Sequence, residues 1–161
     1  MDKVKALVVY YSRSGNTEKA AKYLAQKLAA DLEKIEDNQN RSGILGYLKS
    51  GKQSMMREDV EIIKPQFDAS QYDIVLVGTP VWSMTCCAPV KAYLKKYGGK
   101  ITQAAYFCAM GGLGDKGVYK AMEEACGCAP VACLALTEAD MSEDYEAKAD
   151  IFLSEVKNAV G

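Results

Sequence analysis

The sequence predicts one α/β domain over residues 1–161, in which helices cover both faces of a five-stranded parallel sheet. Short apolar runs alternate along the chain with stretches whose apolar residues recur at helical spacing. Most of these runs are continuously hydrophobic, which is typical of strands buried on both faces. With 161 residues, 49% of them hydrophobic, the chain is long enough for one ordinary core.

Five runs are candidate strands, and the stretches between them are long enough for crossover helices. Each strand is therefore expected to lie parallel to the next in the same sheet. Four are strongly apolar, and the second, with the sequence LEKIE, is weaker. The candidates are residues 4–11, 32–36, 73–80, 104–110 and 131–136.

Helical patterns occupy the intervening stretches. Alanines and leucines recur at helical spacing after Asn16, and a second pattern follows Pro89, a residue favoured in the first turn of a helix. A closing helix is expected to end near Val160, with Ser142 as its N-cap. Residues 43–58 show a helical pattern interrupted by Gly51.

Composition excludes several classes of function. The 20 basic and 21 acidic residues give a net charge of −1, so no nucleic acid or anionic membrane is expected as a partner. Histidine is absent, which excludes His-ligated metals and histidine acid–base chemistry. The six cysteines lack the spacing of a secreted disulfide scaffold, and no apolar run approaches the ~18 residues of a membrane span. We therefore expect a cytoplasmic protein without metal ligands.

The segment SRSGNT, residues 12–17, follows the first strand and contains the start of a helix. A helix N-terminus offers unpaired N–H groups and a partial positive charge, both of which favour phosphate. Gly15 allows the backbone to approach a ligand closely, and the neighbouring hydroxyl and amide side chains add donors. Asn16 stands where a Walker A loop has lysine, so a nucleoside triphosphate is disfavoured. The loop also lacks a cysteine nucleophile, which argues against a phosphatase. A phosphate monoester is the expected ligand.

This segment resembles the phosphate loop of flavodoxins, whose pattern is Ser/Thr-x-Ser/Thr-Gly-x-Thr. Residues 77–94, VGTPVWSMTCCAPVKAYL, are similar to the second flavin loop, and residues 107–119, FCAMGGLGDKGVY, to the third. The resemblance covers essentially the whole chain. It implies a short-chain, flavodoxin-like three-layer sandwich with strand order 2-1-3-4-5.

The resemblance also implies that the cofactor is FMN, and it assigns site residues by position. Trp82, the only tryptophan, is the expected stacking aromatic for the isoalloxazine. The phosphate would be bound by Ser12, Arg13, Ser14, Gly15, Asn16 and Thr17. The isoalloxazine would be lined by Thr79, Pro80, Val81, Trp82, Ser83 and Met84, with Met110, Gly111, Gly112 and Asp115 from the third loop.

A second glycine motif points to another ligand. Residues 112–117 match G-x-G-x-x-G, and Glu138 lies about 20 residues further on, where a ribose-binding carboxylate is found in dinucleotide folds. Such folds begin with this motif, whereas here it stands three-quarters of the way along the chain. A dinucleotide site is therefore the weaker interpretation.

The cysteines lack the C-x₂-C runs of common iron–sulfur sites. Cys108 and Cys133 lie in apolar strands and are expected to pack as small hydrophobic residues. Cys86 and Cys87 lie in the second flavin loop just before a helix. A lowered thiol pKa and redox reactivity are a hypothesis for that pair.

Two functions remain open. The favoured one, from small size and full-length resemblance, is a flavodoxin that carries electrons between redox partner proteins. The alternative is an FMN-dependent NAD(P)H:quinone-type oxidoreductase with a small electron acceptor. Two features favour the alternative: the near-neutral charge, with a basic stretch at 41–57, and the lack of glycine between Thr79 and Pro89. In flavodoxins a backbone carbonyl commonly turns toward flavin N5, a rotation that is easiest beside glycine.

Overall fold

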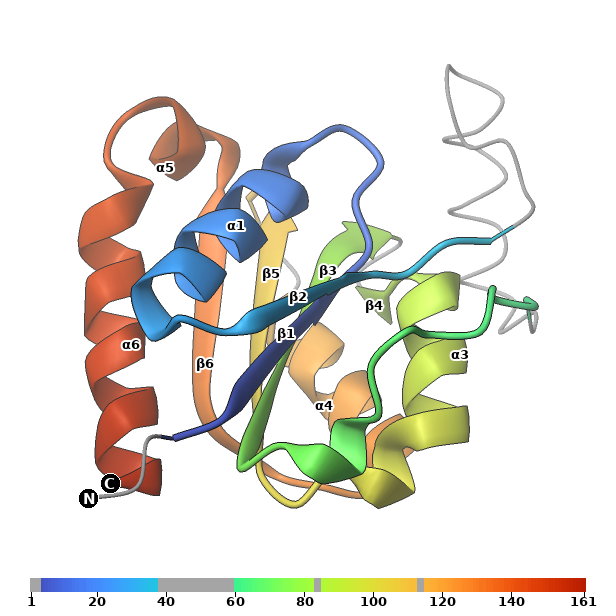
Figure 1. The fold of residues 1–161 in the computed structure, drawn as a ribbon. Helices are drawn as coiled ribbons and strands as arrows, with labels where there is room; N and C mark the ends of the chain where they lie inside the picture. The colour runs from blue at the N-terminus through green and yellow to red at the C-terminus, as the bar shows by residue number, and fades with distance from the viewer. Residues whose placement is uncertain (1–3, 38–59, 83–84, 113–114) are drawn as a thin grey trace.

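The computed structural model describes residues 4–37, 60–82, 85–112 and 115–161, which form a three-layer α/β sandwich (Figure 1). The strands are β1 (Ala6–Tyr10), β2 (Asp31–Lys34), β3 (Ile74–Trp82), β4 (Thr85–Cys86), β5 (Ala104–Met110) and β6 (Pro130–Thr137). The helices are α1 (Asn16–Leu28), α3 (Ala88–Tyr97), α4 (Asp115–Cys126), α5 (Glu138–Ser142) and α6 (Tyr145–Val160), with short 3₁₀ turns η1 (Ala69–Gln71) and η2 (Gly98–Lys100).

The main sheet has the order β2-β1-β3-β5-β6, and each neighbouring pair is parallel. This confirms the predicted five-stranded parallel sheet and its order. β4 is an addition that the sequence did not predict, and it pairs antiparallel with the end of β3. The end of β3 is therefore one arm of a small hairpin.

Alternate residues of each central strand supply two separate cores. In β1, Leu7 and Val9 pack toward α3 and α4, whereas Ala6, Val8 and Tyr10 pack toward α1 and α6. All five are buried. Because both faces are covered by helices, the strand is apolar at every position, as the continuous pattern predicted.

The contact between β3 and β5 depends on a glycine. Gly78 lies opposite Phe107 in the register of the two strands. A Cβ atom at position 78 would lie 2.2 Å from the Phe107 ring. The ring therefore fills the space that any larger residue at 78 would need, and the two central strands stay closely packed.

The outer strand β6 differs from its prediction. Leu134 and Leu136 are buried toward α6, whereas Val131 is 39% exposed and Cys133 is exposed. The expectation that Cys133 packs as a buried hydrophobic residue is wrong. β6 is an edge strand, and its residues alternate between a face covered by α6 and a face open to solvent.

The predicted cap of the closing helix is also wrong. Ser142 ends the short helix α5, which Thr137 and Asp140 begin with a reciprocal capping box. Asp144 caps α6 instead, accepting a hydrogen bond from the Ala147 N–H at 3.3 Å.

The helical pattern at residues 43–58 lies outside the described residues. No helix in the described part of the chain is both long and apolar enough to cross a membrane.

Candidate functional site at the carboxyl edge of the sheet

The loops that follow β1, β3 and β5 meet at the edge of the sheet that is uppermost in Figure 1. β1 ends opposite Gly78, and β3 continues past it to Trp82. The Tyr11 N–H donates to the Gly78 carbonyl at 3.2 Å, so the first loop starts directly against β3. Ligands of open α/β sheets bind at this edge, beside the strand where the order reverses.

The first loop depends on the backbone of Gly15. Its φ is +104°, a left-handed value that disfavours other residues, and nothing lies within 4 Å of its missing Cβ. The glycine is therefore required by conformation and not by crowding. Its N–H donates to Ser12 Oγ at 3.1 Å, and its carbonyl accepts from Lys19 N at 2.9 Å, which begins α1.

No side chain in the described part of the chain caps α1, so its first-turn N–H groups remain available to an anion. Arg13 and Ser14 are exposed, Ser12 and Asn16 are half-buried, and Thr17 is 2% exposed. The structure thus brings the predicted phosphate-binding residues together around one helix N-terminus.

The sequence did not predict one hydrogen bond next to this loop. The Tyr10 hydroxyl donates to Glu18 Oε1 at 2.8 Å, which ties the end of β1 to the first turn of α1. This bond, with Lys22 and Lys34 at 3.9 and 3.6 Å, holds the pKa of Glu18 below its ordinary value. Burial and the same bond raise the pKa of Tyr10. No local motif signals this contact, because it depends on how α1 packs on the sheet.

The second loop is a hairpin held at its base by Thr79. Val81 pairs with Cys86 across β3 and β4. Thr79 is fully buried, and its hydroxyl accepts from the Cys87 N–H at 3.0 Å and donates to the Pro80 carbonyl at 2.8 Å. The Thr79 hydroxyl is therefore used inside the protein, where it joins the two ends of the hairpin.

Trp82 lies at the tip of the described part of this hairpin. It is 4% exposed, and its ring meets the Tyr11 ring edge-on at 5.6 Å with an interplanar angle of 88°. This contact joins the first and second loops. Ser83 and Met84 lie outside the described residues, and stacking of Trp82 on a flavin stays a prediction.

Both cysteines of the second loop are buried, and burial affects the reactivity of their thiols. Cys86 is 1% exposed, and burial raises the pKa of its thiol to about 11. The hypothesis of a lowered pKa is therefore wrong for Cys86. Cys87 is fully buried beside Thr79, with Sγ 3.2 Å from the threonine hydroxyl.

The third loop leaves β5 at Met110, which is half-buried against the core on the α3 and α4 side. Gly111 and Gly112 are exposed, and Asp115 begins α4. The full glycine motif cannot be traced, because residues 113–114 lie outside the described residues. Within the described ranges no group of three or more cysteine or carboxylate side chains is arranged to hold a metal ion.

A family model described as flavodoxin matches residues 5–148. The chain belongs to the flavodoxin family. The match spans β1 through the first turn of α6, and so includes the three loops described above.

Solved structures share the fold at low sequence identity. A Lactobacillus acidophilus flavoprotein in complex with FMN is 22% identical, with a TM-score of 0.73, covering 89% of this chain and 99% of that one. Flavodoxin 1 from Bacillus cereus is 21% identical (TM-score 0.54; 95% and 97% covered). A flavodoxin, WrbA-like protein from Agrobacterium tumefaciens is 13% identical (TM-score 0.59; 98% and 97% covered). No curated protein sequence matches the chain.

Proposed function

We propose that this flavodoxin-family chain binds one FMN at the carboxyl edge of its sheet. The observation that carries the proposal is the loop around Gly15, whose left-handed backbone precedes an uncapped N-terminus of α1 that is available to an anion. The residues present fit a phosphate monoester. The Lactobacillus acidophilus flavoprotein, which has this fold, was solved with FMN.

Each loop has a separate task in this proposal. The first loop binds the phosphate through backbone N–H groups and through hydroxyls such as that of Ser14. The hairpin held by Thr79 forms a wall for the flavin ring, with Trp82 at its tip. The Tyr10–Glu18 hydrogen bond keeps the start of α1 aligned with the end of β1. Bound FMN supplies the redox chemistry.

We propose further that the protein carries electrons between redox partner proteins in the cytoplasm. Three observations support this role. The family match covers residues 5–148, nearly the whole chain, and the resemblance to Bacillus cereus flavodoxin 1 extends over 97% of that protein. Cys86, at the second loop, has a raised pKa and does not supply a ready thiolate.

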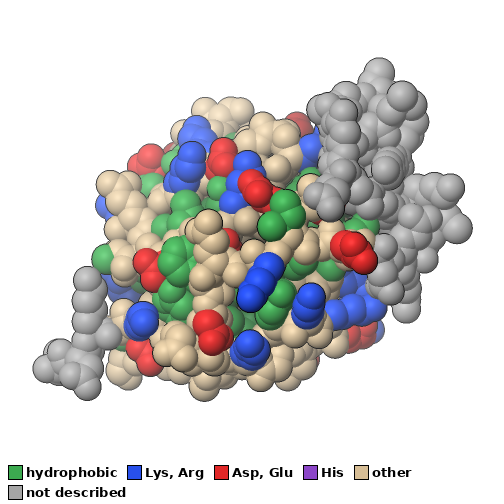
Figure 2. Space-filling model, turned by 45° about the vertical axis from the view of Figure 1, so that its right-hand side comes forward, with side chains coloured by type: hydrophobic (Ala, Val, Ile, Leu, Met, Phe, Trp, Pro, Cys, Tyr) green, Lys and Arg blue, Asp and Glu red, His purple; other side chains and the backbone are tan. Residues whose placement is uncertain are grey.

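One observation favours the alternative, an NAD(P)H:quinone-type oxidoreductase. Electron carriers often present a single-sign surface that steers encounter with a partner. Figure 2 shows Lys and Arg side chains interspersed with Asp and Glu over the described part of the face in view, and the net charge is −1. A small acceptor does not require a single-sign surface.

The cofactor is tested by comparing FMN with riboflavin by isothermal titration calorimetry. We expect one FMN per chain, and riboflavin binding weaker by about tenfold or more, since several charge-assisted hydrogen bonds to phosphate are lost. Equal affinity for the two flavins would contradict the phosphate site.

The role is tested on the FMN-loaded protein. Potentiometry that resolves two separate one-electron reductions, with no NAD(P)H oxidation in the presence of a quinone, would support the carrier. Rapid NAD(P)H oxidation coupled to quinone reduction would establish the enzyme instead.

A further inference from the structure

A buried carboxylate lies away from the three flavin loops. Glu33, on the edge strand β2, is 7% exposed, and its Oε1 accepts the Phe67 N–H at 2.8 Å. Among the described residues this is its one hydrogen bond. A carboxylate can accept about four such bonds, and a buried charge is costly unless it is paired. Glu33 therefore has acceptor capacity that the described structure does not use.

The carboxylate lines a cavity of about 270 Å³ between β2, the segment 62–66 and α3. That segment runs outside β2, where Ile63 N–H donates to the Glu36 carbonyl at 2.8 Å (Figure 1). Ile35, Ile62 and Pro65 give the cavity an apolar wall. Lys34, Glu36 and Lys64 also line the cavity, but all three are exposed, so Glu33 is its one buried charge among the described residues. An apolar wall with a few polar groups is typical of a small-molecule site.

Tyr93 of α3 lines the same cavity. The residue is 1% exposed, and its hydroxyl has no hydrogen-bond partner in the described part of the chain. Its ring contacts the Tyr97 ring at a centroid distance of 5.2 Å. Buried hydroxyl groups are nearly always hydrogen-bonded, so an unpaired one that lines the same cavity as a buried carboxylate indicates that a ligand or water completes the arrangement.

We propose that this cavity is a binding site for a small organic ammonium ion with an apolar or aromatic body. The ammonium group would donate to Glu33 and to the Tyr93 hydroxyl oxygen, satisfying both. Its positive charge offsets the buried carboxylate, and the Tyr93 ring adds a cation–π contact. The apolar body packs on Ile35, Ile62 and Pro65. The site is separate from the FMN loops and does not rest on flavin binding.

The test uses 2-phenylethylamine as the probe, with 2-phenylethanol and phenylacetate as neutral and anionic analogues of similar shape. Binding to the FMN-loaded full chain is followed by calorimetry and by amide shifts in NMR spectra. We expect the amine to bind, the alcohol to bind at least about tenfold more weakly than the amine, and the acid not to bind, because only the amine offsets the buried charge. Equal binding of amine and alcohol, or no binding of the amine, would overturn the proposal.

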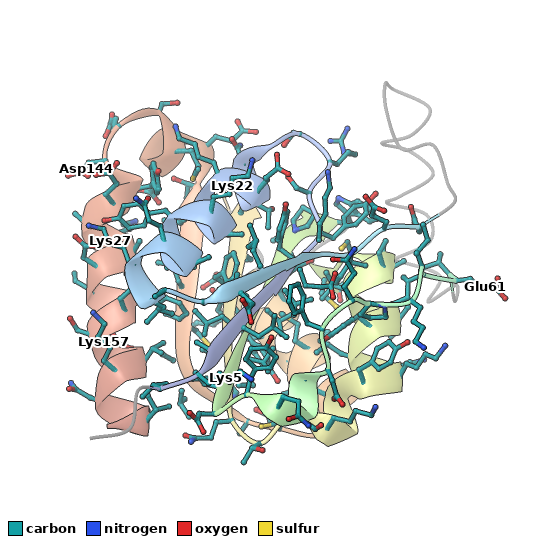
Figure 3. The ribbon with its side chains drawn as sticks, in the orientation of Figure 1. Lys5, Lys22, Lys27, Glu61, Asp144 and Lys157 are labelled. Carbon is teal, nitrogen blue, oxygen red and sulfur yellow. The ribbon has the colours of Figure 1, made fainter. Side chains whose placement is uncertain are left out.

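Variants separate the site from a non-specific contact. Glu33→Gln keeps an oxygen to accept from Phe67 N–H and is expected to weaken amine binding about tenfold, with Tyr93→Phe weakening it several-fold. Glu61→Gln is the matched control, because Glu61 is exposed on the adjoining segment and points away from the molecule in Figure 3.

Thermal melts and FMN titration accompany each variant. Unchanged amine affinity in a folded Glu33→Gln protein refutes the site. If Glu33→Gln does not fold, Tyr93→Phe decides, and unchanged affinity in that variant refutes the site equally. Loss of amine binding with FMN binding intact supports the site. A wild-type chain that binds amine but not FMN would refute the proposed function alone.

Discussion

The first and second flavin loops reach the same edge of the sheet by different physical means. The loop at residues 12–17 is shaped by backbone conformation, with Gly15 at φ +104° and the side chains of Arg13 and Ser14 exposed to solvent. The hairpin at residues 79–87 is shaped by packing, with Thr79 and Cys87 fully buried and Trp82 in the core. A ligand loop can therefore be specified by a local motif or by long-range burial.

This difference determines what a substitution in each loop is expected to change. A change in the first loop is expected to weaken ligand binding with little effect on the fold, because few core contacts depend on it. A change in the hairpin is expected to destabilise the whole domain, because its residues belong to the core between the sheet and α3. The following predictions test this contrast.

Trp82→Ala is expected to have the largest effect. The side chain is 4% exposed and packs against Tyr11, so truncation should lower the free energy of unfolding by about 3 to 5 kcal/mol. Urea denaturation of the FMN-free protein, followed by circular dichroism, measures it. Trp82→Phe, which retains an aromatic ring, should lose less. A loss below about 1 kcal/mol would show that Trp82 contributes little to the stability of the core, and would favour a role in ligand contact alone.

Thr79→Val should have the next largest effect. It removes the acceptor of the buried Cys87 N–H while keeping the shape of the side chain, at an expected cost of about 1 to 3 kcal/mol in the free energy of unfolding. The same urea titration checks it, with Thr79→Ser as the control that keeps the hydroxyl. Equal stability of the valine and serine variants would show that the hydroxyl does not hold the hairpin.

Gly15→Ala should affect the ligand more than the fold. Alanine at positive φ costs about 1 to 2 kcal/mol. If the variant loop relaxes to another conformation in the free protein, this cost is incurred when phosphate binds, so FMN affinity should fall about tenfold while riboflavin affinity changes little. Gly99→Ala is the control, since Gly99 also has open space around its missing Cβ but no positive φ. Equal losses of affinity for FMN and riboflavin would show that Gly15 does not act through phosphate binding.

The smallest effect concerns pH. The pKa of Glu18 is lowered in the folded protein, chiefly by the hydrogen bond from Tyr10. The folded state thus binds a proton on Glu18 less readily than the unfolded state. The resulting stability is fully present above the ordinary glutamate pKa and is lost as the pH falls through the lowered value. Tyr10→Phe should flatten this acid-range dependence of the unfolding free energy. An unchanged profile would contradict the role of the bond.

Local patterns were sufficient for the architecture and for the first loop. The continuous apolar runs predicted the parallel strands, because burial on both faces imposes that pattern on the central ones, and the resemblance of the three loops to flavodoxins supplied the strand order. The start of α1 at Asn16 and the need for Gly15 follow from turn and helix-start chemistry within six residues. Such features involve neighbours along the chain, so the residues themselves encode them.

Features that join distant segments depended on packing. Nothing near Thr79 in the sequence shows that its hydroxyl meets Cys87, and nothing near Glu33 shows a cavity that is also lined by Tyr93 of α3. The exposure of Cys133 likewise follows from the place of β6 at the edge of the sheet, which its apolar pattern did not reveal. Burial is a property of what lies against a residue in space, and a one-dimensional pattern records only what the residue is able to tolerate.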